Sequence, residues 1–141
     1  MIKLLSVEEM EYTAFRLAKE LMSFDEPIPD FATRFPHILE SSIFAPFQKF
    51  EKKFLYKGLI GKAAILFYFI IKNHPFQNGN KRIAMTTLMV FLHKNKKWIS
   101  VDQKEFYNFA VWVATSSPKF KDETVMAIVK FLKSYIVDLK N

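Results

Sequence analysis

The sequence of 141 residues contains no cysteine, only three glycines and no long apolar run. The absence of cysteine excludes disulfide bonds and thiolate metal sites. The longest apolar run, residues 63–71, is far shorter than the ~20 residues of a membrane-spanning helix, and the first residues do not resemble a signal peptide. These absences predict a soluble, cytoplasmic protein with no membrane partner.

The scarcity of glycine and the lack of alternating apolar and polar residues disfavour an all-β fold. Half of the residues are hydrophobic and 16 are phenylalanine, which is enough for a substantial core. The length fits one domain that covers residues 1–141. The three histidines, His37, His74 and His93, do not have the spacing of a zinc site.

Positive charge is concentrated in the later part of the chain. Residues 1–48 contain 4 basic and 8 acidic side chains, which gives a charge balance of −4. Residues 49–141 contain 17 basic and 6 acidic side chains, which gives a charge balance of +11. A basic surface favours an acidic partner such as a nucleotide or an acidic protein, although scattered lysines also occur on any solvated surface. Nucleic acid is the least expected partner, because no nucleic-acid-reading motif is recognisable.

The hydrophobic pattern predicts an all-α helical bundle around a buried central helix. Ser6 followed by Glu9 is typical of a capping box and opens a helix that reaches about Met22. Further helices are expected at residues 39–50, 54–73, 83–94, 102–115 and 121–139. The first of these should be interrupted near Pro46, and Asp102 or Ser100 should be the N-cap of helix 102–115. Residues 83–94 are apolar on every face, so this helix is predicted to be the buried one.

Most of the polar chemistry in the middle of the chain lies in one nine-residue stretch between two apolar runs. It reads His74-Pro75-Phe76-Gln77-Asn78-Gly79-Asn80-Lys81-Arg82. Pro75 disfavours helical geometry at the residue before it, so the preceding helix should end at Asn73 or His74. Gly79 can take a positive φ, and Asn80 is a credible N-cap of the next helix.

A loop of this composition is typical of a phosphate site. The N–H groups that begin a helix, the positive end of its dipole and the side chains of Lys81 and Arg82 would converge on one point. His74 is a suitable general base, because histidine titrates near neutrality. Taken separately, these features are more often ordinary loop and surface residues; their joint spacing favours a functional site.

The same stretch resembles the signature of the Fic/Doc family, H-P-F-x-[DE]-G-N-[GK]-R. The matching residues are His74, Pro75, Phe76, Gly79, Asn80, Lys81 and Arg82. Lysine in the penultimate position resembles the Doc (death-on-curing) toxin branch, whereas AMP-transferring Fic enzymes usually have glycine there. Residues 34–42 resemble that branch's R-D-x-G-L-L-E-S-A segment, and residues 64–73 resemble its apolar lead-in helix.

The resemblance implies a role for each matching residue. His74 would be the general base that takes a proton from a target hydroxyl, and Phe76 would anchor the loop in the core. The phosphates of ATP would be bound by Gly79, Asn80, Lys81 and Arg82. Arg82 would also act catalytically, by stabilising the charge that develops during transfer.

The implied function is transfer of a phosphate-containing group from ATP to a hydroxyl side chain of a target protein. Lys81 favours the Doc-like reaction, in which the γ-phosphate moves to a translation factor, and Fic-like AMP transfer is the alternative. The family's metal, Mg²⁺, would be bound at Asn78, where the usual ligand is Asp or Glu. Because Asn78 brings no charge, a non-enzymatic nucleotide- or partner-binding module stays open as a third function.

The resemblance also bears on regulation and on target binding. Fic proteins often contain an inhibitory [ST]-x-x-x-E helix; the nearest match here, Ser134 to Asp138, fits an ordinary C-terminal helix better. Restraint by a separate antitoxin protein in trans is therefore expected. A β-hairpin flap of the family would correspond to residues 24–36, where Pro27 and Pro29 limit any strand and a simple surface loop is an equal alternative.

Overall fold

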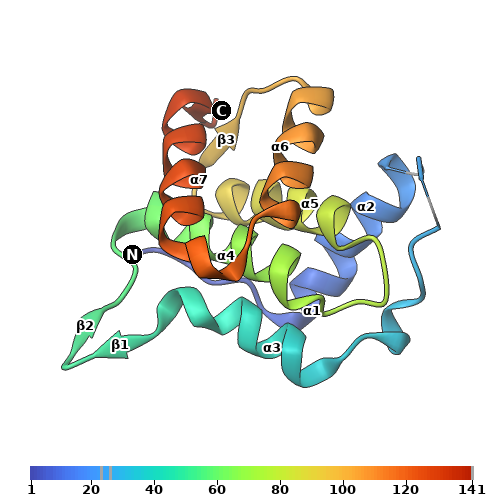
Figure 1. Ribbon diagram of the computed structural model, residues 1–141, viewed down its shortest axis with the longest axis horizontal. Helices are drawn as coiled ribbons and strands as arrows, with labels where there is room; N and C mark the ends of the chain where they lie inside the picture. The colour runs from blue at the N-terminus through green and yellow to red at the C-terminus, as the bar shows by residue number, and fades with distance from the viewer. Residues whose placement is uncertain (23, 26, 141) are drawn as a thin grey trace.

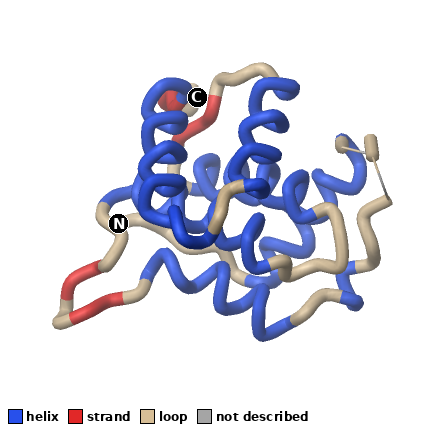
Figure 2. The backbone as a smooth tube through the Cα atoms, viewed as in Figure 1, coloured by secondary structure: helices blue, strands red, loops and turns tan. Residues whose placement is uncertain are grey.

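The computed structural model describes residues 1–22, 24–25 and 27–140, and it consists mainly of packed helices (Figure 1). The helical segments are α1 (Val7–Glu9), the π-helical turn η1 (Met10–Phe15), α2 (Arg16–Leu21), α3 (Pro36–Phe44), α4 (Gly58–Asn73), α5 (Asn80–Lys94), α6 (Gln103–Thr115) and α7 (Lys121–Tyr135), with short 3₁₀ turns at Phe31–Thr33, Ala45–Phe47 and Pro118–Phe120. The strands form two small antiparallel pairs (Figure 2): β1 (Lys49–Phe50) with β2 (Lys53–Phe54), and β3 (Lys97–Ile99) with β4 (Ile136–Asp138). The predicted all-α bundle is confirmed, with these two strand pairs as additions.

The buried centre of the bundle is α5. It packs against α4, α6, β3 and the N-terminal helical segments, and most of its side chains are excluded from solvent. Ile83 and Leu92 are completely buried, and Leu88 nearly so. Full burial of each such side chain contributes about 1.5–3 kcal/mol, so the apolar surface of this helix is a main source of stability. The expected buried helix is confirmed, and it begins at Asn80, three residues before the predicted start.

The first helix begins as predicted. The Ser6 hydroxyl accepts a hydrogen bond from the Glu9 N–H, and the Glu9 carboxylate accepts one from the Ser6 N–H, which completes a capping box. Asp102 is the N-cap of α6, where its carboxylate accepts hydrogen bonds from two backbone N–H groups. Local side-chain chemistry therefore set both helix starts.

Two predicted helix boundaries near residue 50 are wrong. The helix expected over 39–50 runs instead from Pro36 to Phe44, because proline suits the first helical position and Pro46 starts a separate 3₁₀ turn. The helix expected from residue 54 begins at Gly58, because residues 49–54 form the β1–β2 hairpin, which projects from the body at the lower left of Figure 1. Pairing between neighbouring strands replaced helical hydrogen bonds in this segment.

The last predicted helix, 121–139, ends at Tyr135 because the chain after it pairs with β3. Ile136 lies opposite Ile99 in this pair, and the Asp138 carboxylate forms an ion pair with Lys97. The segment from Ser134 to Asp138 therefore crosses from a helix into a strand. It is not the ordinary C-terminal helix that the sequence predicted.

For residues 24–36 the sequence left a hairpin flap and a surface loop as alternatives. The described residues before α3 contain no strand, only the 3₁₀ turn at Phe31–Thr33, so the loop is confirmed for this part. Ile28 and Phe31 are buried, so the loop is fastened to the core at two points. None of the helices in the described part of the chain has the length and apolarity needed to cross a bilayer.

The bond between Thr86 and Ala14 gives a stability prediction. The Thr86 hydroxyl donates to the Ala14 carbonyl at 2.7 Å, and this bond joins α5 to η1 in the interior. We expect Thr86→Val to lower the free energy of unfolding by about 1–3 kcal/mol, because the shape is kept while a buried hydrogen bond is lost. Thermal and urea denaturation would measure the loss. Thr115→Val on the exposed face of α6 is the control, and equal stability of both variants would contradict the assignment.

Candidate active site

The loop between α4 and α5 turns sharply because two of its residues adopt a left-handed backbone. His74, directly after α4, has φ 52° and ψ 62°, and Gly79, directly before α5, has φ 77°. A left-handed residue is common just after a helix, but it costs about 1–2 kcal/mol for a residue other than glycine. The predicted helix end at Asn73 or His74 and the positive φ at Gly79 are both confirmed.

Asn80 is not the N-cap that the sequence predicted. Gly79 occupies that position and Asn80 is the first residue of α5. The Asn80 side chain turns back into the loop instead: its Oδ1 accepts from the Phe76 N–H at 3.0 Å, and its Nδ2 donates to the Phe76 carbonyl at 2.9 Å. Both backbone groups of a buried residue are thereby satisfied, which explains why the amide folds inward rather than capping the helix.

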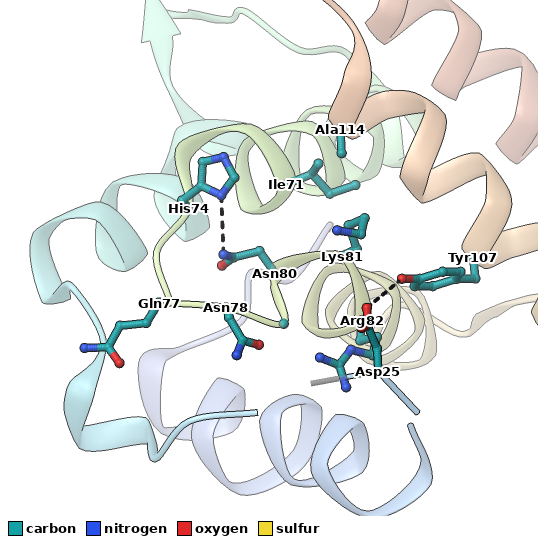
Figure 3. A pocket seen from close by; sticks show the side chains of 11 residues that line it. Asp25, Ile71, His74, Gln77, Asn78, Asn80, Lys81, Arg82, Tyr107 and Ala114 are labelled. Carbon is teal, nitrogen blue, oxygen red and sulfur yellow. Dashed lines mark hydrogen bonds between the residues drawn. The ribbon is translucent and has the colours of Figure 1, made fainter. Parts of the chain in front are cut away.

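The Asn80 amide also lies beside His74. Its Nδ2 is 3.5 Å from His74 Nδ1 (Figure 3). A neutral imidazole has a proton on one ring nitrogen and a lone pair on the other. His74 is exposed and lines the cavity described below, so its ring is accessible to a hydroxyl group and suits a general base.

Phe76 lies in the core, at the position where the resemblance implied an apolar anchor. Its side chain is 1% exposed. Its ring stacks on Phe15 with centroids 5.4 Å apart and lies 5.9 Å from Phe31. These contacts join the loop to η1 and to the surface loop before α3.

A cavity of about 320 Å³ opens beside the loop, within the usual size range of small-ligand sites. It is lined by Asp25, Ile71, His74, Gln77, Asn78, Gly79, Asn80, Lys81, Arg82, Tyr107 and Ala114. Gly79 is closely packed at its rim: a Cβ there would lie 2.9 Å from Ile28 Cγ1, in a backbone conformation that already favours glycine. The loop, the start of α5 and its first cationic side chains thus meet at one cavity.

The two cations predicted to bind phosphate have different surroundings. Lys81 is half-buried, lines the cavity and forms no ion pair with any residue that the structure describes. Arg82 is buried, and its Nη1 donates to the carbonyls of Met22 at 3.0 Å and Phe24 at 2.6 Å. A guanidinium has five N–H donors in a planar fork, so Arg82 can hold this segment and an anion together.

Asn78, the predicted metal ligand, is engaged in a contact that a carboxylate could not make. Its Nδ2 donates to the Pro27 carbonyl at 3.0 Å. Across residues 1–22, 24–25 and 27–140, no group of three or more His, Cys, Asp or Glu side chains is placed to hold a metal ion. Asp25 is the acidic residue among the described cavity lining, and Mg²⁺ commonly needs only one or two carboxylates besides phosphate oxygens and water.

Asp25 and Tyr107 were not foreseen from the sequence. Tyr107 lies on α6, where its hydroxyl donates to the Asp25 carboxylate at 3.4 Å and its ring contacts Phe24 edge-on at 5.0 Å. Burial raises the pKa of the Tyr107 hydroxyl and the Asp25 charge adds to this effect, so the group remains a donor at neutral pH. Neither residue belongs to a recognisable motif, so no sequence signal marked them.

The inward bonds of Asn80 can be tested by a substitution of nearly equal size. Asn80→Asp keeps the acceptor for the Phe76 N–H but sets an oxygen against the Phe76 carbonyl, so we expect a loss of about 1–3 kcal/mol in stability. Urea denaturation would measure it. Asn108→Asp, at an exposed position within α6, should leave stability nearly unchanged. An Asn80→Asp protein as stable as the Asn108→Asp control would show that the amide donor does not hold the loop.

One of three comparisons with known proteins identifies the family of this chain. No curated protein and no solved structure matches the chain. The sequence model of the Fic/DOC family matches residues 10–92, which is more than half of the chain and contains η1, α4 and the whole loop. This chain therefore belongs to the Fic/DOC family.

Proposed function

We propose that this protein transfers a phosphate-containing group from ATP to a hydroxyl side chain of a target protein. Membership of the Fic/DOC family supports nucleotidyl or phosphate transfer to proteins in general. The observation that carries the proposal is the meeting of the His74 imidazole with Gly79, Lys81 and Arg82 at one cavity. A base beside an anion site is the minimum that transfer to a hydroxyl requires.

Each residue of the cavity has a separate role in the proposed transfer. Lys81, Arg82 and the start of α5 bind the phosphates and stabilise negative charge as it develops. The His74 imidazole accepts the proton of the attacking hydroxyl. Gly79 makes the left-handed turn that leads into α5, where a side chain would collide with Ile28. Mg²⁺, bound by phosphate oxygens with Asp25 or Asn78, would supply charge neutralisation.

The identity of the transferred group rests on Lys81. Its place in the motif favours Doc-like transfer of the γ-phosphate to a translation factor, with Fic-like AMP transfer as the alternative. The bond of Asn78 to Pro27 and the bonds of Arg82 to residues 22 and 24 favour a third candidate, a nucleotide- or partner-binding module of weak activity. In that case the loop would bind ATP but would not turn it over.

An antitoxin protein in trans is part of the same proposal. The nearest counterpart of an inhibitory motif, Ser134 to Asp138, ends in a carboxylate that pairs with Lys97 in the β3–β4 pair. That carboxylate is therefore engaged in a contact with its own sheet. Control of the active site by a separate acidic protein is consistent with the +11 balance of residues 49–141.

Transfer can be tested with ATP labelled separately at the α or the γ phosphate. We expect the purified protein to label a protein in bacterial lysate from γ-labelled ATP only. His74→Ala should reduce the labelling rate by about 10²–10⁴-fold, because it removes the general base. His93→Ala is the matched control, since this exposed histidine lies at the far end of α5.

The outcomes separate the three candidates. Label from the α phosphate would identify AMP transfer in place of the kinase reaction. Calorimetric binding of ATP without transfer would identify the binding module. A folded His74→Ala protein that transfers at the wild-type rate would overturn the role of His74.

A second prediction concerns the metal. Asn78→Asp removes the amide donor to Pro27, so without Mg²⁺ we expect a lower melting temperature and weaker ATP binding. With Mg²⁺ and ATP the variant should gain more thermal stability than the wild type, since a carboxylate binds the ion better than an amide. Gln77→Glu, which adds a carboxylate to the exposed part of the loop, is the control. An equal Mg²⁺ response in wild type and Asn78→Asp would show that position 78 is not a metal ligand.

A further inference from the structure

We propose that the acceptor segment of the target protein binds in a groove between α3 and the C-terminal end of α4, with its hydroxyl presented to His74. The inference rests on the proposed function and adds to it the place and the chemistry of target binding. The groove is a cavity of about 400 Å³ lined by His37, Ile38, Ser41 and Asn73. Asn73 directly precedes His74, so the groove and the phosphate cavity meet at the catalytic histidine.

Two hydrogen bonds fix α3 beside the loop. The Phe35 N–H donates to the Pro75 carbonyl at 2.9 Å, immediately before α3 begins. The Asn73 amide contacts the Ser42 hydroxyl at 3.5 Å, about two turns farther along α3. In Figure 3, His74 lies at the end of α4 with the cyan ribbon of α3 on one side and the residues of the phosphate cavity on the other. A target segment held against α3 would therefore reach His74 and present its hydroxyl between the imidazole and the phosphate cavity.

The start of α3 exposes two large apolar side chains beside the groove. Phe35, the residue before the helix, is 45% exposed, and Ile38, which lines the groove, is 38% exposed. Residues three apart are neighbours on a helix surface. The face of α3 with Leu39 and Ile43 already packs in the core, so Phe35 and Ile38 are not needed there. Exposed apolar side chains next to a groove favour an interaction surface.

The polar groups of the groove decide which partner it fits. Its polar lining consists of His37, Ser41 and Asn73, with no lysine, arginine or carboxylate among the described lining residues, and α3 lies in the part of the chain with a balance of −4. An acidic ligand would be drawn instead to the basic residues 49–141. The groove therefore suits an extended, uncharged segment of the target, in which a large apolar side chain packs on Ile38 close to the Ser or Thr that is modified.

The structure also requires such a surface if a target is to be held. The described residues of 24–36 contain no strand to which an extended target could add at that place. The β1–β2 hairpin precedes the first turn of α4 (Figure 1), whereas His74 follows the last residue of that helix. The α3 groove, in contrast, adjoins the base directly.

The test compares charged substitutions at two exposed apolar positions. We expect Ile38→Asp to reduce labelling of the target from labelled ATP by at least tenfold, mainly through a higher KM for the labelled protein once it has been purified from lysate. ATP affinity measured by calorimetry and the melting temperature should match the wild type. Met126→Asp on α7, where the side chain is 57% exposed, is the matched control and should label normally.

Each outcome decides the proposal. Equal labelling by Ile38→Asp and Met126→Asp would overturn the groove while leaving the proposed transfer intact. A wild-type protein that labels nothing would overturn both. Loss of ATP binding in Ile38→Asp would also overturn the groove, because residue 38 would then belong to the nucleotide site. Should Ile38→Asp fail to fold, Ser41→Arg, which fills the same groove from the exposed surface of α3, applies the same criteria.

Discussion

The inward-turned amide of Asn80 is the interaction on which the active loop depends. It binds both backbone groups of Phe76, which allows that aromatic ring to sit in the core without leaving buried polar atoms unpaired. With Phe76 fixed, the chain between two left-handed residues, His74 and Gly79, has little freedom. The same amide lies 3.5 Å from the His74 imidazole. One side chain therefore links the shape of the loop, the packing of the core and the position of His74.

The site is built from two parts of the chain that differ in charge. The basic part supplies the loop and the start of α5, while the acidic N-terminal part supplies the supports around them. Phe15 stacks on Phe76, Ile28 closes the space beside Gly79, and the Pro27 carbonyl binds Asn78. Because these contacts span about fifty to sixty residues of sequence, the loop acquires its geometry only when the N-terminal helices dock against α5. This organisation makes the geometry of the loop depend on the stability of the whole fold.

The fold was predictable wherever a local signal fixed it. The capping box at Ser6, the N-cap at Asp102 and the break at Pro75 each act within a few residues, and all three are confirmed. Predictions failed where strand pairing decided the outcome. Helix was expected at residues 49–50, at residue 54 and after Tyr135, but each of these places lies in a strand that pairs with another strand. The periodicity of the sequence does not show such pairing. The prediction that Asn80 is an N-cap was also wrong. Its side chain binds the backbone of Phe76 in the loop and not the N–H groups of the helix.

The sequence by itself determined the family and the order of residues around the loop, because both depend on which side chains stand at which spacing. It also determined the buried helix α5, since a segment that is apolar on every face is most stable in the interior. Only the tertiary structure decided that Asp25 and Tyr107 line the cavity, that Arg82 binds the carbonyls of residues 22 and 24, and that Asn78 is fastened to Pro27. These contacts join residues far apart in the chain, and their geometry follows from how whole helices pack rather than from any local preference.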